Sequence, residues 1–237
     1  MKNLRKQDLL GLGIFAVIFV VFYLLFDQEV LDDYWETNVI MILINIILSV
    51  SLNLINGFTG QFSIGHAGFM AVGAYVSAII TVKLGMDFAL ALIVGTLAAA
   101  FLGFLIGMPT LRLDGDYLAI ATLGLGEIIR IAILNINYVG GASGFMGIPR
   151  LTTFPIAFWI MVFVVYVIKN FKNSADGRAC LAIRENEIAA ETMGINTTKY
   201  KVMAFTIGAG FAGTAGALFS HYYYIAHPAS FTFMRSF

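Results

Sequence analysis

The residues of this sequence that could do chemistry are few, and they fall within or beside long apolar runs. Glu127 and Arg130 are three positions apart, a spacing that allows an ion pair along one helix. His66 is the only histidine among the first 200 residues, and no second type of metal ligand lies at a suitable spacing near it. The sequence offers hydrogen bonding, charge pairing or proton relay, and we predict no catalytic residue and no metal site.

A polar stripe runs along the apolar segment 37–55 and just beyond it. Asn45, Ser49, Asn53 and Asn56 stand at i, i+4, i+8 and i+11, which places them on one face of a helix. Amide groups in hydrocarbon are costly unless they have partners. We expect the stripe to face other helices or water, either as hydrogen bonds between helices or as the lining of a polar path.

Residues 57–68 carry four glycines in twelve positions. Glycine permits tight turns and close backbone approach, so we predict a short re-entrant or broken segment, with Ser63 capping the helix that follows. Irregular backbone is tolerated inside a membrane where protein or a wet cavity surrounds it. The residues predicted to line a polar path are Asn45, Ser49, Asn53, Gly60, Gln61, Ser63, His66, Glu127 and Arg130.

Two of these predictions compete with simpler interpretations. His66 also fits a structural histidine that is held by a hydrogen bond. Glu127 and Arg130 also fit a pair that only neutralises its own charges, because a single charge at the centre of a span costs about 2.5–3.5 kcal/mol.

Composition decides which elements must position these residues. The chain has 237 residues, of which 59% are hydrophobic and 12% charged, and its mean hydropathy is +0.87. Soluble domains carry about 25% charged residues, so this composition excludes a soluble enzyme, a nucleic-acid-binding protein and a disordered chain. A lone cysteine excludes an internal disulfide. The prediction is an all-α polytopic integral membrane protein.

Seven runs are long and apolar enough to be candidate membrane spans, for which about 20 residues suffice. The first run follows a basic N-terminus but is too long and lacks a small-residue cleavage site, which favours an uncleaved span over a signal peptide. The predicted spans cover residues 9–26, 37–55, 67–84, 88–108, 116–137, 154–168 and 202–224.

Charge sets the expected orientation. With the N-terminus in the cytoplasm, ten basic residues fall on the inner side and two on the outer side, and the first outer loop is acidic. The inner loop 169–201 is the longest polar segment and carries two short helical patterns. Asp176 and Asn186 are predicted to cap them, and Gly194 stands where a helix ends. The second helix fits either a docking element for a soluble partner or a helix lying on the membrane surface.

Energy for any active process has to come from outside this chain or from an ion gradient. The sequence contains no phosphate-binding loop of the Gly-x-x-x-x-Gly-Lys-Ser/Thr type, and it has no nucleophile elbow.

Three segments resemble one family. Residues 52–70, LNLINGFTGQFSIGHAGFM, resemble the signature of branched-chain amino-acid ABC importer permeases, and residues 115–124, GDYLAIATLG, resemble the M-type subunit. Residues 177–194 resemble the cytoplasmic coupling loop of that family, with Glu187 one place early against its Glu-Ala-Ala pattern. The likeness covers about residues 38–231. The family normally continues with further spans beyond this region, which agrees with a fragment.

The resemblance implies a single transmembrane permease domain over residues 1–237 in the inner membrane of a prokaryote. It implies a second, H-type permease subunit, two cytoplasmic ATPase subunits that bind the ATP, and an external protein that delivers leucine, isoleucine or valine. This chain itself would bind no cofactor and no nucleic acid, and would contact membrane lipid. The implied coupling residues are Arg178, Arg184, Glu187, Ala189, Ala190 and Gly194.

Two other transport functions remain open at this point. Relatives of the family carry urea or short amides. An ion-coupled secondary transporter would instead use Glu127, Arg130 and His66 as a relay. A membrane enzyme is disfavoured because no catalytic constellation is present.

Overall fold

A computed structural model describes residues 2–28, 31–111, 113 and 115–236 of the chain. Helices dominate it, because backbone groups in a lipid environment have to be satisfied within each segment. The α-helices of the described residues are α1 (Lys2–Asp27), α2 (Asp33–Asn53), α3 (His66–Ala78), α4 (Phe88–Thr110), α5 (Asp116–Asn135), α6 (Phe154–Asn173), α7 (Ala175–Glu185), α8 (Glu187–Thr192) and α9 (Thr197–Tyr223).

Six of the described helical segments are long and apolar enough to cross a membrane. Two of them end in π-helical turns. Leu54–Phe58 continues α2, and Ile79–Lys83 continues α3. The described apolar part of α1, Gly13–Asp27, is shorter than these six. The predicted all-α polytopic class is confirmed, and the run expected at 154–168 lies in α6, which extends to Asn173.

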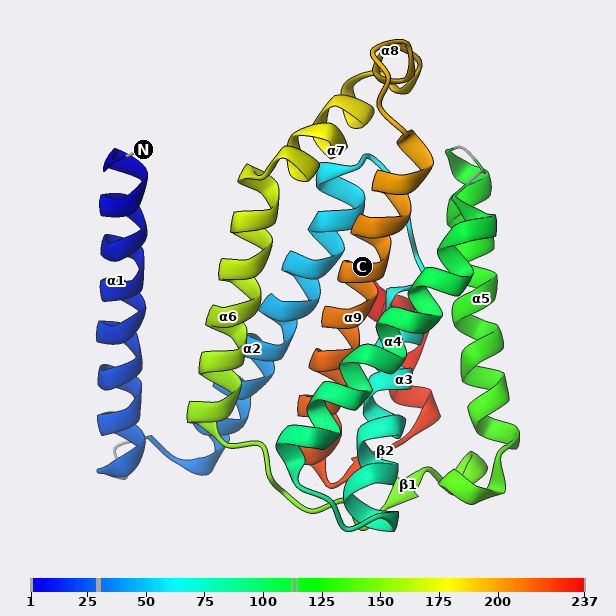
Figure 1. Cartoon of the computed structure of the whole chain (residues 1–237). Coiled ribbons are helices and arrows are strands. Elements are labelled where there is room, and N and C mark those ends of the chain that lie inside the picture. The colour runs from blue at the N-terminus through cyan, green and yellow to red at the C-terminus, as the bar shows by residue number, and fades with distance from the viewer. Residues whose placement is uncertain (1, 29–30, 112, 114, 237) are drawn as a thin grey trace.

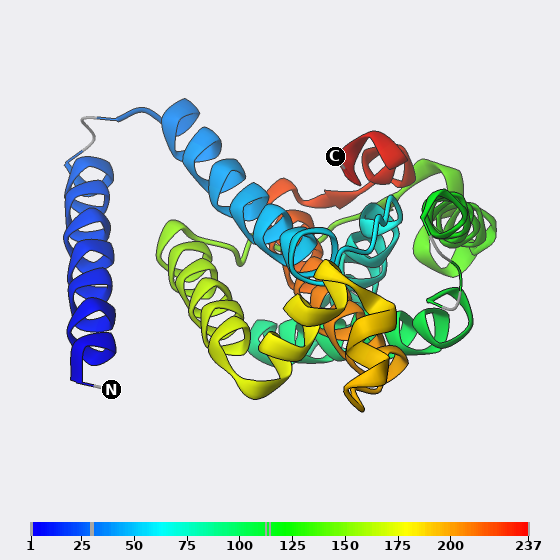
Figure 2. The same ribbon diagram turned by 90° about the horizontal axis from the view of Figure 1, so that it is seen from above.

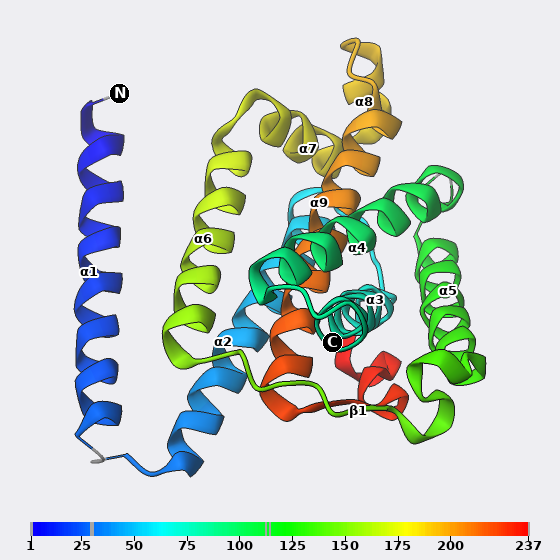
Figure 3. The ribbon, with the colours of Figure 1, turned by 60° about the horizontal axis from the view of Figure 1, so that its bottom comes forward.

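Helices α3 and α9 occupy the centre of the bundle. In their apolar stretches 72% and 78% of residues are buried, against 22% in α4 and in α5. Figure 1 shows α9 in the middle, with α1 and α5 at opposite edges, and Figure 3 shows the same order from a tilted view. The two most polar connections of the chain, α7 and α8, lie at the same end of the bundle as the start of α1 (Figure 1).

Small residues allow the central helices to touch through their backbones. The stripe Gly208, Ala212, Gly216 and Ser220 on α9 is buried along its whole length. A Cβ atom added at Gly216 would overlap the carbonyl oxygen of Met70, and one added at Gly73 would overlap the backbone of Gly213. Side chains are therefore excluded from both sides of the α3–α9 contact, which is the packing that small-residue stripes allow in membranes.

Helix α1 stands beside the bundle and contacts it through aromatic rings. The ring centroids of Phe19 and Phe158 lie 5.3 Å apart, and those of Phe26 and Phe154 lie 5.2 Å apart. Figure 2 shows α1 separated from the other helices, with α6 as its nearest neighbour in the bundle. Offset and edge-to-face ring pairs of this kind stabilise the contact beyond the area they bury.

The glycine-rich segment 140–147 closes the other end of the bundle. It contains the 3₁₀ turn Gly141–Ser143 and strand β1 (Phe145–Met146), which pairs antiparallel with β2 (Ile225–Ala226) directly after α9. Gly140 and Gly144 have φ angles of 86° and 80°, a region that residues with a Cβ rarely adopt. The segment is thus an ordered connector that joins the end of α5 to the end of α9.

We predict that Gly73→Ala and Gly216→Ala destabilise the protein by about 1–3 kcal/mol each, because the added methyl group meets backbone that cannot rotate away. Gly124→Ala on α5 is the matched control, since a Cβ there meets no atom within 4 Å. The measurement is the melting temperature in detergent, taken as the temperature at which the monodisperse fraction on size-exclusion chromatography falls by half. Equal melting temperatures for Gly216→Ala and Gly124→Ala would contradict the close contact of α3 and α9.

Candidate functional site

The predicted break in the helical backbone lies between the π-helical end of α2 and the start of α3. Side chains from other elements take over its hydrogen bonds. The Ser63 N–H donates to Asn56 Oδ1 at 3.2 Å, and the Ile64 N–H donates to Thr122 Oγ1 at 3.0 Å. The Ala67 N–H donates to the Ser236 hydroxyl at 2.9 Å. These acceptors make irregular backbone tolerable inside the bundle.

One detail of this segment differs from the sequence prediction. Gly65, and not Ser63, is the N-cap residue of α3, and because glycine has no side chain it offers no side-chain acceptor for the first N–H groups of the helix. Thr122 on α5 crowds Gly65, since a Cβ at Gly65 would lie 3.0 Å from the Thr122 carbonyl carbon. Ser63 is instead buried within the broken segment, and its backbone N–H donates to Asn56.

Polar atoms concentrate along this broken segment. Gln61, Ser63 and His66 are 4%, 2% and 2% exposed. His66 Nε2 lies 2.8 Å from the Ser51 hydroxyl, which fits the structural histidine. Among the described residues, no hydrogen-bond partner is found for either side-chain polar atom of Gln61, for Ser63 Oγ or for His66 Nδ1. Buried polar groups usually have partners, so these atoms can bond to a polar group that enters here.

The polar stripe of α2 divides between two surroundings. Asn56 reaches the broken segment, whereas Asn45, Ser49 and Asn53 lie exposed on the outer side of α2. The apolar residues between them pack inward, with Ile44 and Ile47 fully buried. The structure therefore does not bring the stripe together with Gln61, Ser63 and His66. A polar face on a membrane span is costly in contact with lipid, so it requires water or a second chain.

The predicted ion pair on α5 is present. Arg130 Nε donates to Glu127 Oε2 at 2.7 Å, and the two side chains are 26% and 27% exposed. Helix α5 approaches the broken segment and the start of α3 through glycines, since a Cβ at Gly126 would lie 3.4 Å from Gly65 Cα and one at Gly68 would lie 2.9 Å from Gly126 Cα. Glu127 is thereby placed at the edge of this segment, where it lines a cavity of about 10 Å³ together with Gly65 and Ser236.

We call α7, α8 and the turn to Gly194 (residues 175–194) the coupling element, after the coupling loop that this part of the sequence resembles. Its first helix is capped by Ser174, whose hydroxyl accepts the Gly177 N–H at 3.1 Å, so the prediction of Asp176 as cap is wrong. Ser174 is the N-cap residue because it stands directly before the first helical residue, Ala175. Asn186 caps α8 as predicted, accepting the Ala189 N–H at 2.9 Å. Gly194 adopts a left-handed φ of 83°, which confirms its role as a helix-ending residue.

The predicted coupling residues differ in their exposure. Arg178, Arg184 and Ala189 are exposed, whereas Ala190 is only 4% exposed. The exposed apolar side chains of this region are Ile188 at 76% and Met193 at 82%. Sequence reasoning treated Ala189 and Ala190 alike, because an alanine pair carries no signal about which member packs inward.

Cys180 joins the coupling element to α9. Its thiol is fully buried and lies 3.8 Å from the Tyr200 carbonyl oxygen. Burial, with a contribution from nearby Asp176, raises the pKa of the Cys180 thiol to about 11. The sulfur is therefore a protonated packing group at neutral pH and not a reactive thiolate.

Two cavities open at the end of the bundle that carries the coupling element. One, of about 790 Å³, is lined by Gly60 and Gln61 of the broken segment and by Arg184, Glu187 and Lys201. It brings two predicted pathway residues together with two predicted coupling residues. Sequence reasoning missed Lys201 here, because no periodic spacing connects it to Glu187.

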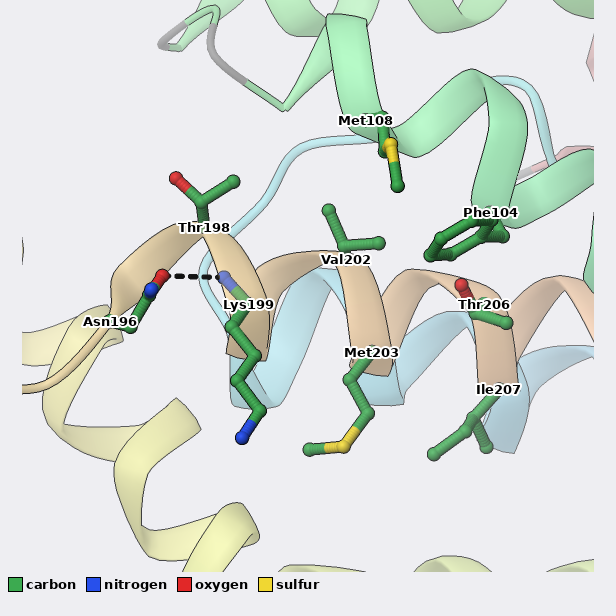
Figure 4. Close-up of a pocket in the computed structure, with 9 residues that line it drawn as sticks. All are labelled: Phe104, Met108, Asn196, Thr198, Lys199, Val202, Met203, Thr206 and Ile207. Carbon is green, nitrogen blue, oxygen red and sulfur yellow. Dashed lines mark hydrogen bonds between the residues drawn. The ribbon is translucent and has the colours of Figure 1, made fainter.

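The second cavity, of about 700 Å³, lies between α4 and α9 and is mainly apolar. Figure 4 shows Phe104 and Met108 of α4 facing Val202 and Thr206 of α9. At one end of it the Asn196 side chain accepts the Lys199 N–H at 3.0 Å and caps α9. No predicted pathway or coupling residue lines this cavity.

A metal centre finds no support in the described part of the chain, which contains no cluster of three or more His, Cys, Asp or Glu side chains able to hold an ion.

Comparison with known proteins identifies relatives of one kind. Residues 35–237 match the family described as branched-chain amino acid transport system / permease component. The permease protein LivM of Salmonella typhimurium is 38% identical over 231 residues, covering 83% of this chain and 54% of that protein. LivM of Escherichia coli K12 is 38% identical over 229 residues, with 82% and 54% covered.

A second permease type is also related. LivH of Escherichia coli K12 is 25% identical over 213 residues, covering 77% of this chain and 68% of that protein. No solved structure matches. The chain spans about half the length of the LivM proteins it matches first. Since the family match covers residues 35–237, which is most of the chain, the chain belongs to the family of branched-chain amino acid transport permeases.

Proposed function

We propose that this chain forms part of the membrane pathway of an ATP-driven importer for leucine, isoleucine or valine. ATP would be bound and hydrolysed on separate subunits, and the chain would contribute no covalent chemistry. The proposed substrate is supported by the LivM relatives, which are named as branched-chain amino acid transport permeases.

One observation carries the proposal. The cavity of about 790 Å³ has the broken segment on one side and the coupling element on the other. Movement at the coupling element would therefore change the surroundings of Gly60 and Gln61 directly. A short capped helix with exposed Ile188 and Met193 supplies an apolar surface for a soluble subunit.

Orientation and partners belong to the same proposal. We place the N-terminus and the coupling element in the cytoplasm, because the start of α1 and α8 lie at the same end of the bundle and basic residues favour that side. The likeness to both LivM and LivH supports a pair of permease chains. Two ATPase subunits and an external binding protein complete the proposed assembly in the inner membrane of a prokaryote.

We predict ATP-dependent uptake of labelled leucine by proteoliposomes that contain this chain, an H-type permease, the ATPase subunits and the binding protein. An ionophore should leave the uptake unchanged, because the energy comes from ATP. Labelled urea is the control substrate and should not accumulate. Uptake that ignores ATP and collapses with the ion gradient would instead support a secondary transporter that uses Glu127, Arg130 and His66.

We predict that the double variant Ile188→Glu/Met193→Glu loses the ATPase subunit during co-purification. Two exposed apolar anchors would be replaced by charges, which should weaken association about tenfold or more. Met146→Glu is the control, because Met146 is 64% exposed in β1 at the opposite end of the bundle. Undiminished co-purification of the double variant would count against docking on α8.

We predict that Glu127→Gln and Arg130→Gln each reduce the yield of folded protein, because one charge is left in a span at a cost of about 2.5–3.5 kcal/mol. The swapped pair Glu127→Arg/Arg130→Glu should recover both yield and leucine uptake, since the two side chains bond to each other. Recovered yield without uptake would mean that one of these groups acts directly on the transport path.

A further inference from the structure

Several polar contacts tie the coupling element to the rest of the bundle, and two of them reach its central helix and the end of α2. Lys201 Nζ on α9 lies 2.5 Å from the Glu187 carboxylate at the start of α8. Arg184 Nη1 at the end of α7 donates to the Gly57 carbonyl oxygen at 3.1 Å. The first contact connects α8 with the central helix, and the second connects α7 with the π-helical end of α2.

The contact with α9 is the more buried of the two. The Lys201 side chain is 9% exposed and that of Glu187 is 37% exposed. An ammonium group at this depth is costly unless an opposite charge lies beside it, so the pair resists separation. The Glu187 side chain is therefore held against α9 of its own chain by Lys201.

A second contact fixes the same face of α8. The Thr197 hydroxyl, at the start of α9, donates to Glu191 Oε1 at 2.8 Å. Glu187 and Glu191 are four residues apart and share one side of the helix. Ile188, next to Glu187, is 76% exposed. Helix α8 thus presents its acids to α9 and apolar side chains to the outside.

The contact at Arg184 leads to the broken segment. Gly60 has a φ of 70°, and a Cβ there would lie 3.0 Å from Arg184 Cγ. The end of α7 therefore rests against the chain one residue before Gln61. The coupling element therefore contacts α9, the central helix, and also the broken segment between α2 and α3.

We propose that Glu187 is a positioning residue that ties α8 to α9 within this chain, so that a displacement of α8 moves α9 and, through Arg184, the end of α2. The inference rests on the proposed ATP-driven function. It accounts for the position of the glutamate one place early in the coupling pattern, because at that position the acid faces Lys201. The surface that meets the ATPase is then formed by Ile188 and Met193.

The test separates coupling from assembly. Glu187→Gln, Lys201→Gln and the swapped pair Glu187→Lys/Lys201→Glu are reconstituted with the permease, ATPase and binding-protein subunits. Asp176→Asn is the matched control, since it removes an exposed acid from the same element. For each variant, ATPase co-purification, ATP hydrolysis and leucine uptake per ATP are measured.

We expect Glu187→Gln to keep the ATPase bound and hydrolysing, while leucine uptake per ATP falls by about fivefold or more, the usual lower range for coupling between sites. The swapped pair should restore the ratio, and Asp176→Asn should leave it unchanged. Loss of ATPase binding in Glu187→Gln would overturn the inference, because it would make Glu187 a docking contact. An unchanged ratio, or failure of the swapped pair to restore it, would overturn it too.

Amide hydrogen exchange of the purified chain distinguishes this inference from the proposed function. Exchange over α8 should be faster in Glu187→Gln than in Asp176→Asn, and the swapped pair should return it to the wild-type rate. If the wild-type assembly fails to import leucine with ATP, the proposed function is wrong. Amide hydrogen exchange still tests whether Glu187 ties α8 to α9 in that case. Equal exchange rates over α8 in Glu187→Gln and in the wild type would refute the tie.

Discussion

Inside a membrane bundle, an irregular backbone segment persists only if side chains accept its N–H groups, and the break between α2 and α3 obeys this constraint. Asn56, Thr122 and Ser236 supply the acceptors, from the end of α2, from α5 and from the last turn of the described chain. Each unmet donor would cost several kcal/mol in hydrocarbon. The break therefore depends on α5 and on the last described turn, which are both far from it in sequence, staying packed against it.

Close helix contacts hold those elements in place. Gly73 and Gly216 let the backbones of α3 and α9 touch, and Gly68 lets α5 approach α3. Helix α9 has 27 residues, which gives it a length of about 40 Å. It begins at the coupling element and ends beside β2 at the opposite end of the bundle. A helix of this length, packed through small residues along one face, can carry movement from one end to the other as a rigid body.

The polar residues of the spans lie on different surfaces. Gln61, Ser63 and His66 are buried, Glu127 and Arg130 are about one quarter exposed, and Asn45 lies on the outer side of α2. In a single chain surrounded by lipid, the outer polar groups would be unfavourable. Their exposure agrees with the proposal that a second permease chain or a water-filled path covers them.

The sequence alone determined the class of the protein, because apolar runs of span length follow from composition and do not depend on neighbours. It also predicted the ion pair of Glu127 and Arg130, the Asn186 cap and the turn at Gly194, since each depends on residues within three or four positions. Local spacing could not choose between Ser63 and Gly65 as the cap of α3, nor between Asp176 and Ser174 as the cap of α7.

Tertiary structure decided everything that joins distant parts of the chain. The approach of Lys201 to Glu187, of Arg184 to Gly57 and of Thr122 to Ile64 arises from how helices stack, and no periodic pattern encodes it. Burial likewise separated Ala190 from Ala189, and Asn56 from Asn45. A helix face is visible in sequence, but the neighbour that covers it is set by packing between helices.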